Sequence, residues 1–218
     1  MKTMYLMRLE LYCTLQVLMV LCSKVAVDSI GTEPESAKAN EYLIKKWEQW
    51  FYLNDINKDG EMSLDDLNLF ERKFYKGHNN VKNAQQEKIK GTLERRWRRV
   101  MLDNRASISL CDFIGMFKER YESDKQAFTK MITEVESTHV KAIDSNGDNF
   151  ISIEEFVADM DSIGRMDMAN NEKFFFSFPD INGRIPVEVS LAGLVRFLTE
   201  DDQTKPDSMK TFLDSDIK

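Results

Sequence analysis

The chain has 218 residues, of which 42% are hydrophobic, and a formal net charge of −7 at pH 7. That length suits one large domain or two small ones, and the composition is rich enough in apolar residues to build a core. The acidic balance argues against nucleic acid as a partner, because binding to nucleic acid requires a basic face.

The first 27 residues contain an apolar run, residues 11–22, that follows Lys2 and Arg8. This run is too short to span a bilayer, which takes about 20 apolar residues, but it fits the core of a signal peptide. Glu10 and an indistinct cleavage site argue for the alternative, an N-terminal extension. We expect the secretory pathway if residues 1–27 are a signal peptide. Residues 28–40 lack a periodic apolar pattern and predict a linker.

The chain contains three cysteines, Cys13, Cys22 and Cys111, and two histidines, His78 and His139. The cysteines form no CxxC motif and predict no disulfide framework, and Cys111 is expected to stand alone. The wide separation of the two histidines argues against a zinc site.

Residues 55–66, DINKDGEMSLDD, carry oxygen-bearing side chains at every second position. A 12-residue calcium loop takes oxygen ligands from positions 1, 3, 5, 7, 9 and 12 and has glycine at position 6, which here is Gly60. Tryptophan and phenylalanine residues at helical spacing flank the segment and predict a helix–loop–helix unit. The predicted ligands are Asp55, Asn57, Asp59, Glu61 through its backbone carbonyl, Ser63 and Asp66.

Asp66 stands at position 12, where glutamate is the usual residue. A glutamate reaches Ca²⁺ with both oxygens, whereas the shorter aspartate more readily gives one oxygen, as the octahedral shell of Mg²⁺ requires. The loop is therefore predicted to bind Ca²⁺ with Mg²⁺ competing.

Residues 144–155, DSNGDNFISIEE, repeat this pattern and end in the usual glutamate. Asn149 replaces glycine at position 6, and asparagine tolerates the left-handed backbone better than other residues with a side chain. A second working calcium loop is therefore expected. Its predicted ligands are Asp144, Asn146, Asp148, Phe150 through its backbone carbonyl, Ser152 and Glu155.

Two further segments keep the flanking apolar pattern but lose the ligands. Residues 101–112 have Met101 at position 1 and Arg105 at position 5, so that a side-chain cation replaces the metal and the loop is expected to be empty. Residues 178–189 are also expected not to bind. The alternative there is a distorted weak site that uses Asp180, Asn182 and Glu188.

The apolar residues at position 8 of these segments, Met62, Ile108, Ile151 and Ile185, are expected to pair the loops through short strands. The predicted fold class is all-α, with four helix–loop–helix units in two pairs, residues 41–122 and residues 123–200. In each pair the first loop is active and the second degenerate. A tail, residues 201–218, follows, and its Phe212 and Leu213 are expected to cover an apolar face.

The arrangement resembles the invertebrate sarcoplasmic calcium-binding proteins of the EF-hand superfamily over residues 42–200. The likeness rests on KKWEQWFYLNDINKDGEMSLDDL with Asp66, on DFIGMFKER, on KAIDSNGDNFISIEEF and on SLAGLVRFL. It implies a compact fold of two EF-hand pairs, a cytoplasmic Ca²⁺/Mg²⁺ buffer and the ligand roles given above. The chain departs from the family in its N-terminal stretch and in its fourth loop.

Two other functions stay open at this stage. A sensor that grips a target helix needs an exposed methionine-rich groove, whereas the methionines here are scattered and the aromatic clusters predict a closed core. An enzyme such as a calcium-triggered photoprotein needs histidines in a ligand cavity, whereas His78 and His139 are expected to be structural. We therefore expect a monomer that binds calcium ions, has no catalytic residues and spans no membrane; the sequence indicates no protein target.

Overall fold

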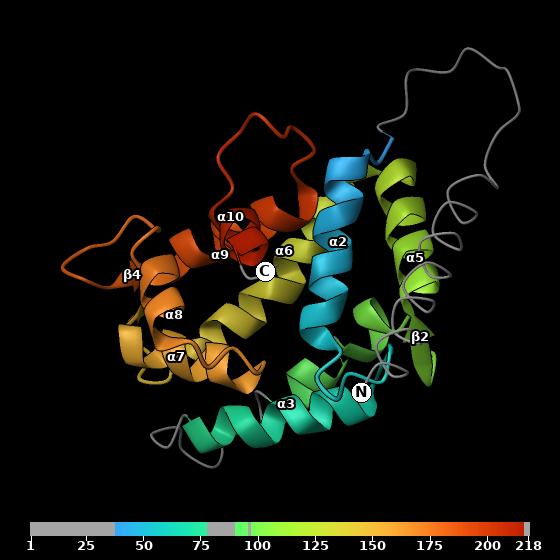
Figure 1. Cartoon of the computed structure of the whole chain (residues 1–218). Helices are drawn as coiled ribbons and strands as arrows, with labels where there is room; N and C mark the ends of the chain where they lie inside the picture. The colour runs from blue at the N-terminus through green and yellow to red at the C-terminus, as the bar shows by residue number, and fades with distance from the viewer. Residues whose placement is uncertain (1–37, 78–89, 96, 216–218) are drawn as a thin grey trace, which may run out of the picture. The chain divides into compact units, whose positions relative to one another are not determined.

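The computed structural model describes residues 38–77, 90–95 and 97–215, all of which belong to one compact unit (Figure 1). The described part is helical apart from two short antiparallel strand pairs, which confirms the predicted all-α class. The predicted signal peptide, His78 and all but the last three residues of the linker lie outside the described residues.

Helices account for most of the described chain, and residues 90–95 are helical as well. The helices are α2 (Glu41–Asn54), α3 (Leu64–Gly77), the π-helix η1 (Trp97–Met101), α5 (Leu110–Ser123), α6 (Lys125–Ile143), α7 (Ile153–Ser162), α8 (Met168–Phe175), α9 (Val187–Thr199) and α10 (Ser208–Ser215). The strands are β1 (Glu61–Ser63), β2 (Ser107–Ser109), β3 (Phe150–Ile151) and β4 (Ile185–Pro186).

The strands join the loops two by two. Strand β1 pairs with β2 and places Met62 opposite Ile108, and β3 pairs with β4 and places Ile151 opposite Ile185. These are the position-8 residues, so the predicted register is confirmed. All four side chains are buried, and each pair therefore fixes two loops back to back.

Trp47 of α2 ties distant helices into one core. Its ring lies edge-on to Phe117 and Tyr121 of α5, with centroids 5.6 and 5.8 Å away, and it also contacts Phe128 of α6. Its indole Nε1–H donates to the backbone carbonyl of Leu198 in α9 at 2.9 Å. The fully buried Trp47 thus holds α2 against both α5 and α9.

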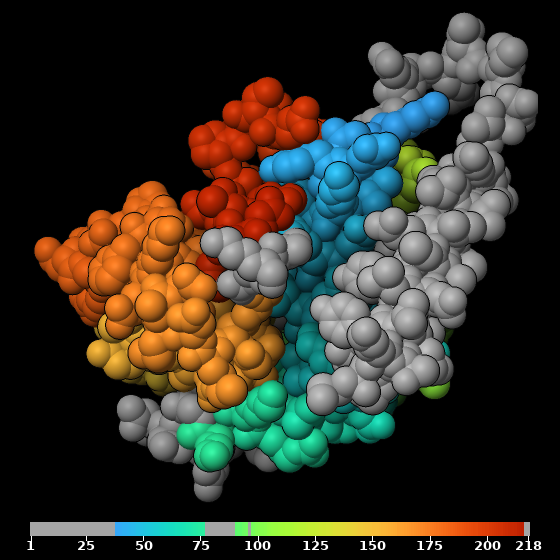
Figure 2. Space-filling view, in the orientation of Figure 1, coloured from blue at the N-terminus to red at the C-terminus, as the bar shows by residue number. Residues whose placement is uncertain are grey.

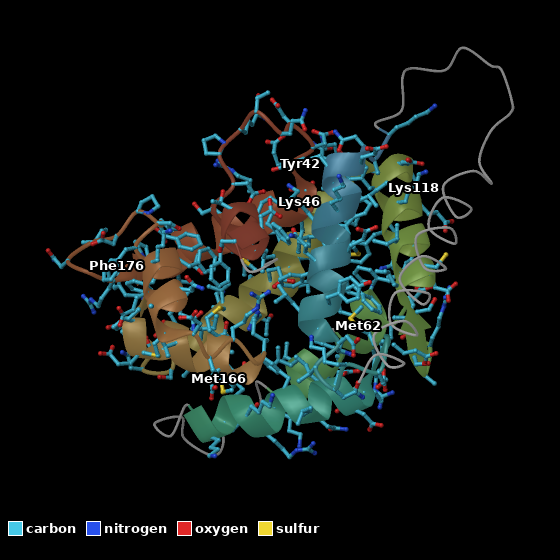
Figure 3. All side chains as sticks on the ribbon, viewed as in Figure 1. Tyr42, Lys46, Met62, Lys118, Met166 and Phe176 are labelled. Atoms are coloured by element: carbon cyan, nitrogen blue, oxygen red, sulfur yellow. The ribbon has the colours of Figure 1, made fainter. Side chains whose placement is uncertain are left out.

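Lys46 connects α2 to the C-terminal segment. Its side chain is fully buried, and its ammonium lies 3.1 Å from the Asp207 carboxylate and 2.6 Å from the carbonyl oxygen of Glu200. The same ammonium stands 4.5 Å from the ring centre of Tyr42, one turn earlier on α2 (Figure 3). Burial lowers the pKa of Lys46, and Asp207 opposes that shift. A buried charge of this kind stays in place because it is paired.

The tail covers apolar surface, as the sequence predicts. Phe212 of α10 stacks on Phe174 of α8 with ring centroids 4.2 Å apart and an interplanar angle of 6°, and Leu213 is buried as well. Figure 2 shows this C-terminal segment in red above the orange surface of α7 and α8. Helix α10 therefore closes the core at this end.

The surface exposes large apolar side chains. Met166 and Phe176 are exposed on the outer side of α7 and α8 (Figure 3). Cys111, expected to stand alone, is instead disulfide-bonded, which its sequence spacing did not indicate. No helix in the described ranges is long and apolar enough to cross a membrane.

Candidate metal centres

The loop between α2 and α3 draws the backbone around Asp66. This side chain lies in the first turn of α3 and is completely buried. Its Oδ1 accepts from the backbone N–H of Asn57 at 3.0 Å, and its Oδ2 accepts from that of Ser63 at 2.9 Å. The last predicted ligand therefore reaches back across the loop toward the others.

The middle of the loop turns through two residues with positive φ, Lys58 at 64° and Gly60 at 93°. Glycine has no Cβ and takes up this conformation at little cost. Asn57 Oδ1 accepts from the N–H of Asp59 at 2.9 Å, and Asp59 Oδ1 accepts from the N–H of Glu61 at 2.9 Å. The alternating side chains thus fold inward along the turn, as the every-second-residue pattern requires.

Asp55 is the residue that best tests whether a cation fits. It follows α2 directly and is buried, and its Oδ2 accepts from the N–H of Gly60 at 3.1 Å. Its Oδ1 is buried without any hydrogen-bond partner in the described part of the chain. Burial is the main cause that raises the pKa of the Asp55 carboxyl, and the charge of Asp66 adds to it. A hard cation would satisfy this oxygen and relieve the crowding of negative charge.

The loop between α6 and α7 has the same construction. Asp144 Oδ2 accepts from the N–H of Asn149 at 2.9 Å, and its Oδ1 accepts from that of Gly147 at 2.8 Å. Glu155 Oε1 accepts from the N–H of Ser145 at 2.9 Å, while Oε2 accepts from that of Ser152 at 3.0 Å. Asp144 and Glu155 are both buried.

Two details of this loop follow from its sequence. Asn149 has φ of 66°, so asparagine does take the left-handed turn at position 6, as expected. The Ser152 hydroxyl accepts from the N–H of Glu155, and Glu155 returns a bond to the Ser152 N–H, which together form a capping box at the start of α7. The predicted ligands at positions 9 and 12 therefore also begin the helix.

Arg184 is a residue that the sequence reasoning missed. Its guanidinium lies 2.7 Å from Asp148 Oδ2 and stands over the ring of Phe150 at 4.5 Å. Arg184 belongs to the neighbouring loop and directly precedes Ile185, the residue paired with Ile151. The strand register alone would place Arg184 opposite Ser152, so the local pattern gave no sign that its long side chain reaches past Phe150 to Asp148.

The loop between η1 and α5 carries its own cation. Met101 at position 1 is buried among apolar side chains, so it offers no oxygen where the first ligand is expected. Arg105 at position 5 has its Nη1 3.7 Å from Asp112 Oδ1 at position 12. The guanidinium thus stands beside the acid at position 12 and supplies a positive charge within the loop.

In the segment before α9 the alternative ligand set is spread over the surface. Asp180, Asn182 and Glu188 are all exposed. Asp180 Oδ1 accepts from the N–H of Gly183 at 2.8 Å, which closes a tight turn held by a bridge between Ile181 and Arg184. This geometry favours a structural turn over a weak site.

The donor sets of both predicted loops are oxygen-only, which is the chemistry that Ca²⁺ and Mg²⁺ prefer. Within the described ranges, no three side chains of His, Cys, Asp or Glu are gathered closely enough to hold a metal ion. The acidic oxygens accept hydrogen bonds from loop backbone N–H groups instead. The asparagine, serine and carbonyl oxygens of each loop complete the predicted set.

Known proteins resemble this chain in sequence and in fold. No family model matches it. A sarcoplasmic calcium-binding protein of Mizuhopecten yessoensis is 25% identical over 177 residues, which cover 80% of this chain and 99% of that protein. The calcium-loaded apo form of coelenterazine-binding protein from Renilla muelleri superposes with a TM-score of 0.63 at 19% identity, over 83% of this chain and 98% of that one.

An amphioxus sarcoplasmic calcium-binding protein also superposes, with a TM-score of 0.52 at 17% identity over 80% of this chain and 97% of that one. Helix–loop–helix units with strand-paired loops, together with these neighbours, show that the chain has an EF-hand fold. Within that fold class it is similar to a sarcoplasmic calcium-binding protein over most of its length, which confirms the resemblance predicted from its sequence.

Proposed function

We propose that this protein binds two Ca²⁺ ions, one in each of the loops 55–66 and 144–155, and acts as a calcium buffer without catalytic activity of its own. The ligands are those predicted from the sequence. The observation that carries the proposal is the buried, unpartnered Oδ1 of Asp55, which lies beside a second buried carboxylate, Asp66. The two anions repel each other until a dication neutralises them.

The two loops differ in preference. Loop 55–66 ends in Asp66 and binds Ca²⁺ and Mg²⁺ in competition, whereas loop 144–155 ends in Glu155 and prefers Ca²⁺. Buffer-type loops of this kind bind Ca²⁺ with Kd values of about 10⁻⁹–10⁻⁸ M, and sensor-type loops with values of about 10⁻⁷–10⁻⁵ M. The repeat of one loop pattern along the chain accounts for both sites.

The distribution of methionine supports a buffer over a sensor that binds a target helix. Among the methionines of the described residues, Met166 and Met168 are exposed, while the others are buried or half-buried in the core. A sensor needs its methionines on a groove that opens with Ca²⁺. A dye that reports exposed apolar surface distinguishes the two, because a large Ca²⁺-dependent rise in its fluorescence would favour the sensor.

Equilibrium dialysis against micromolar ⁴⁵Ca²⁺ tests the proposal. We expect two ions bound per chain in the wild type, one in Asp55→Asn, one in Asp144→Asn and none in the double variant. Asp180→Asn, in the exposed turn before α9, is the matched control and keeps two ions. Fewer than one bound ion per wild-type chain would refute calcium binding altogether.

A further inference from the structure

A mainly apolar cavity of about 100 Å³ lies inside the described unit. It is lined by residues from α2, α3, η1, α6, α7, α8, α9 and α10, among them Trp50, Phe70, Phe156, Leu194 and Met209. No predicted metal ligand is among the lining residues. The cavity therefore needs an explanation separate from ion binding.

Three polar side chains meet on one wall of this cavity. His139 of α6 has its Nε2 3.0 Å from Asp159 Oδ1 of α7 and its Nδ1 3.7 Å from Glu136 Oε2. Burial acts to lower the pKa of His139, but the two carboxylates outweigh it and raise that pKa to about 10. At neutral pH the imidazole is a cation between two buried anions, which makes this wall polar although the rest is apolar.

Trp50 of α2 supplies the second, independent observation. It lines the same cavity and is 6% exposed, and its Nε1–H is buried without a hydrogen-bond partner in the described part of the chain. Trp47, one turn earlier on α2, does use its Nε1–H, so the fold can satisfy a buried indole. Buried polar groups in native proteins usually have partners, and each exception calls for a physical explanation.

Most of the lining is apolar, and apolar cavities take up small apolar molecules such as benzene, whereas a buried water needs two to four polar contacts. Aromatic rings such as those of Trp50, Phe70 and Phe156 also offer faces and edges to a flat guest. The guest that fits both the apolar lining and the free N–H is flat and carries one oxygen acceptor.

We propose that this cavity is a binding site for a small aromatic molecule of about one ring that carries a hydroxyl or carbonyl oxygen, which accepts the Nε1–H of Trp50. The site goes beyond the proposed ion binding and does not depend on it, because the two share no ligand residue. The His139 cluster closes one wall, and the aromatic side chains hold the ring.

The test is a ¹⁹F NMR titration of the full chain at fixed calcium with 4-fluorophenol and with fluorobenzene, which has no oxygen. Wild-type protein is expected to bind both probes, and 4-fluorophenol at least about fivefold more tightly. Trp50→Phe keeps a ring but removes the donor, and it should abolish this preference for the hydroxylated probe. Tyr52→Phe, two residues away on α2 and exposed, is the matched control and should retain it.

Leu194→Phe tests the location, because its larger side chain should fill the cavity and weaken both probes at least tenfold. Leu191→Phe on the same helix does not line the cavity and should leave both affinities unchanged. Circular dichroism melting identifies any variant that fails to fold. If Leu194→Phe fails to fold, the comparison of wild type with Trp50→Phe still tests the site. Absence of binding by the wild type, or equal preference in wild type and Trp50→Phe, overturns the proposal.

Discussion

The carboxylate of Asp148, the predicted position-5 ligand of its loop, lies 2.7 Å from the guanidinium of Arg184 in the neighbouring loop. A guanidinium so close competes with a metal ion for the same oxygen. Both side chains are about 40% exposed, so solvent weakens the pair. We expect Arg184→Gln to strengthen Ca²⁺ binding at loop 144–155 by about two- to fivefold, which corresponds to the upper part of the range for exposed ion pairs.

Calorimetric titration with Ca²⁺ measures this change, and Asp55→Asn can serve as the background so that one loop is followed alone. Arg196→Gln is the control, because it removes the same charge from the exposed face of α9 and does not contact Asp148. Equal effects from the two variants would mean that net charge, and not the contact with Asp148, sets the affinity.

His139 makes folding stability depend on pH in the alkaline range. Its folded pKa is raised to about 10 by Asp159 and Glu136, above the value of about 6.5 expected in the unfolded chain. The stabilisation is therefore complete below pH 6.5 and is lost as the pH rises through about 10. At pH 7, His139→Gln is expected to lower the free energy of unfolding by about 2–4 kcal/mol, because two buried carboxylates lose their partner.

Urea unfolding between pH 6 and pH 10 checks this prediction. The difference between wild type and His139→Gln should narrow as the pH approaches 10, while His78→Gln gives the baseline for removal of a histidine. A difference that stays constant across that range would contradict an ionised His139.

Much of the fold and of the loops could be predicted because the information is local. Alternating oxygen side chains, a turn residue and an apolar position 8 sit within twelve residues of each loop, and the register of Met62 with Ile108 follows from them. The left-handed Asn149 follows from the same local rule. The contact of Arg184 with Asp148, and the shared cavity of Trp50 and His139, depend on how separate elements pack, which periodicity does not specify.

Asp207 holds the C-terminal helix to the core through Lys46. Its Oδ1 accepts from the N–H of Lys210 at the start of α10, and its Oδ2 lies 3.1 Å from the buried ammonium of Lys46. Asp207→Asn keeps an oxygen for the first contact but removes the charge from the second. We expect a loss of about 2–4 kcal/mol in the free energy of unfolding, because the buried ammonium is left without a counter-charge.

Denaturant unfolding of Asp207→Asn and of Asp214→Asn compares the loss of a buried ion pair with the loss of an exposed one. Asp214 is exposed on the same helix and pairs with Lys210, so its variant should change stability by less than about 0.5 kcal/mol. If the two variants lower the free energy of unfolding by the same amount, the buried charge of Lys46 does not need Asp207 as its counter-charge.

Asp66 is expected to set the ion preference of loop 55–66. Lengthening it in Asp66→Glu lets both oxygens reach the ion, which suits the larger shell of Ca²⁺ and disfavours the six-ligand shell of Mg²⁺. Calorimetry with Ca²⁺ in the absence and presence of millimolar Mg²⁺ should show that Mg²⁺ weakens Ca²⁺ binding less in the variant than in wild type. We expect the ratio of Ca²⁺ to Mg²⁺ affinity to rise by about tenfold.

The reciprocal change, Glu155→Asp in loop 144–155, is the matched partner and should make that loop more sensitive to Mg²⁺. Glu155 also caps α7 through Ser152, so the melting temperature of this variant is compared with that of wild type before the affinities are interpreted. If Asp66→Glu leaves the ratio of Ca²⁺ to Mg²⁺ affinity unchanged, the length of the position-12 side chain does not determine selectivity here, and the difference between the loops must come from their other ligands.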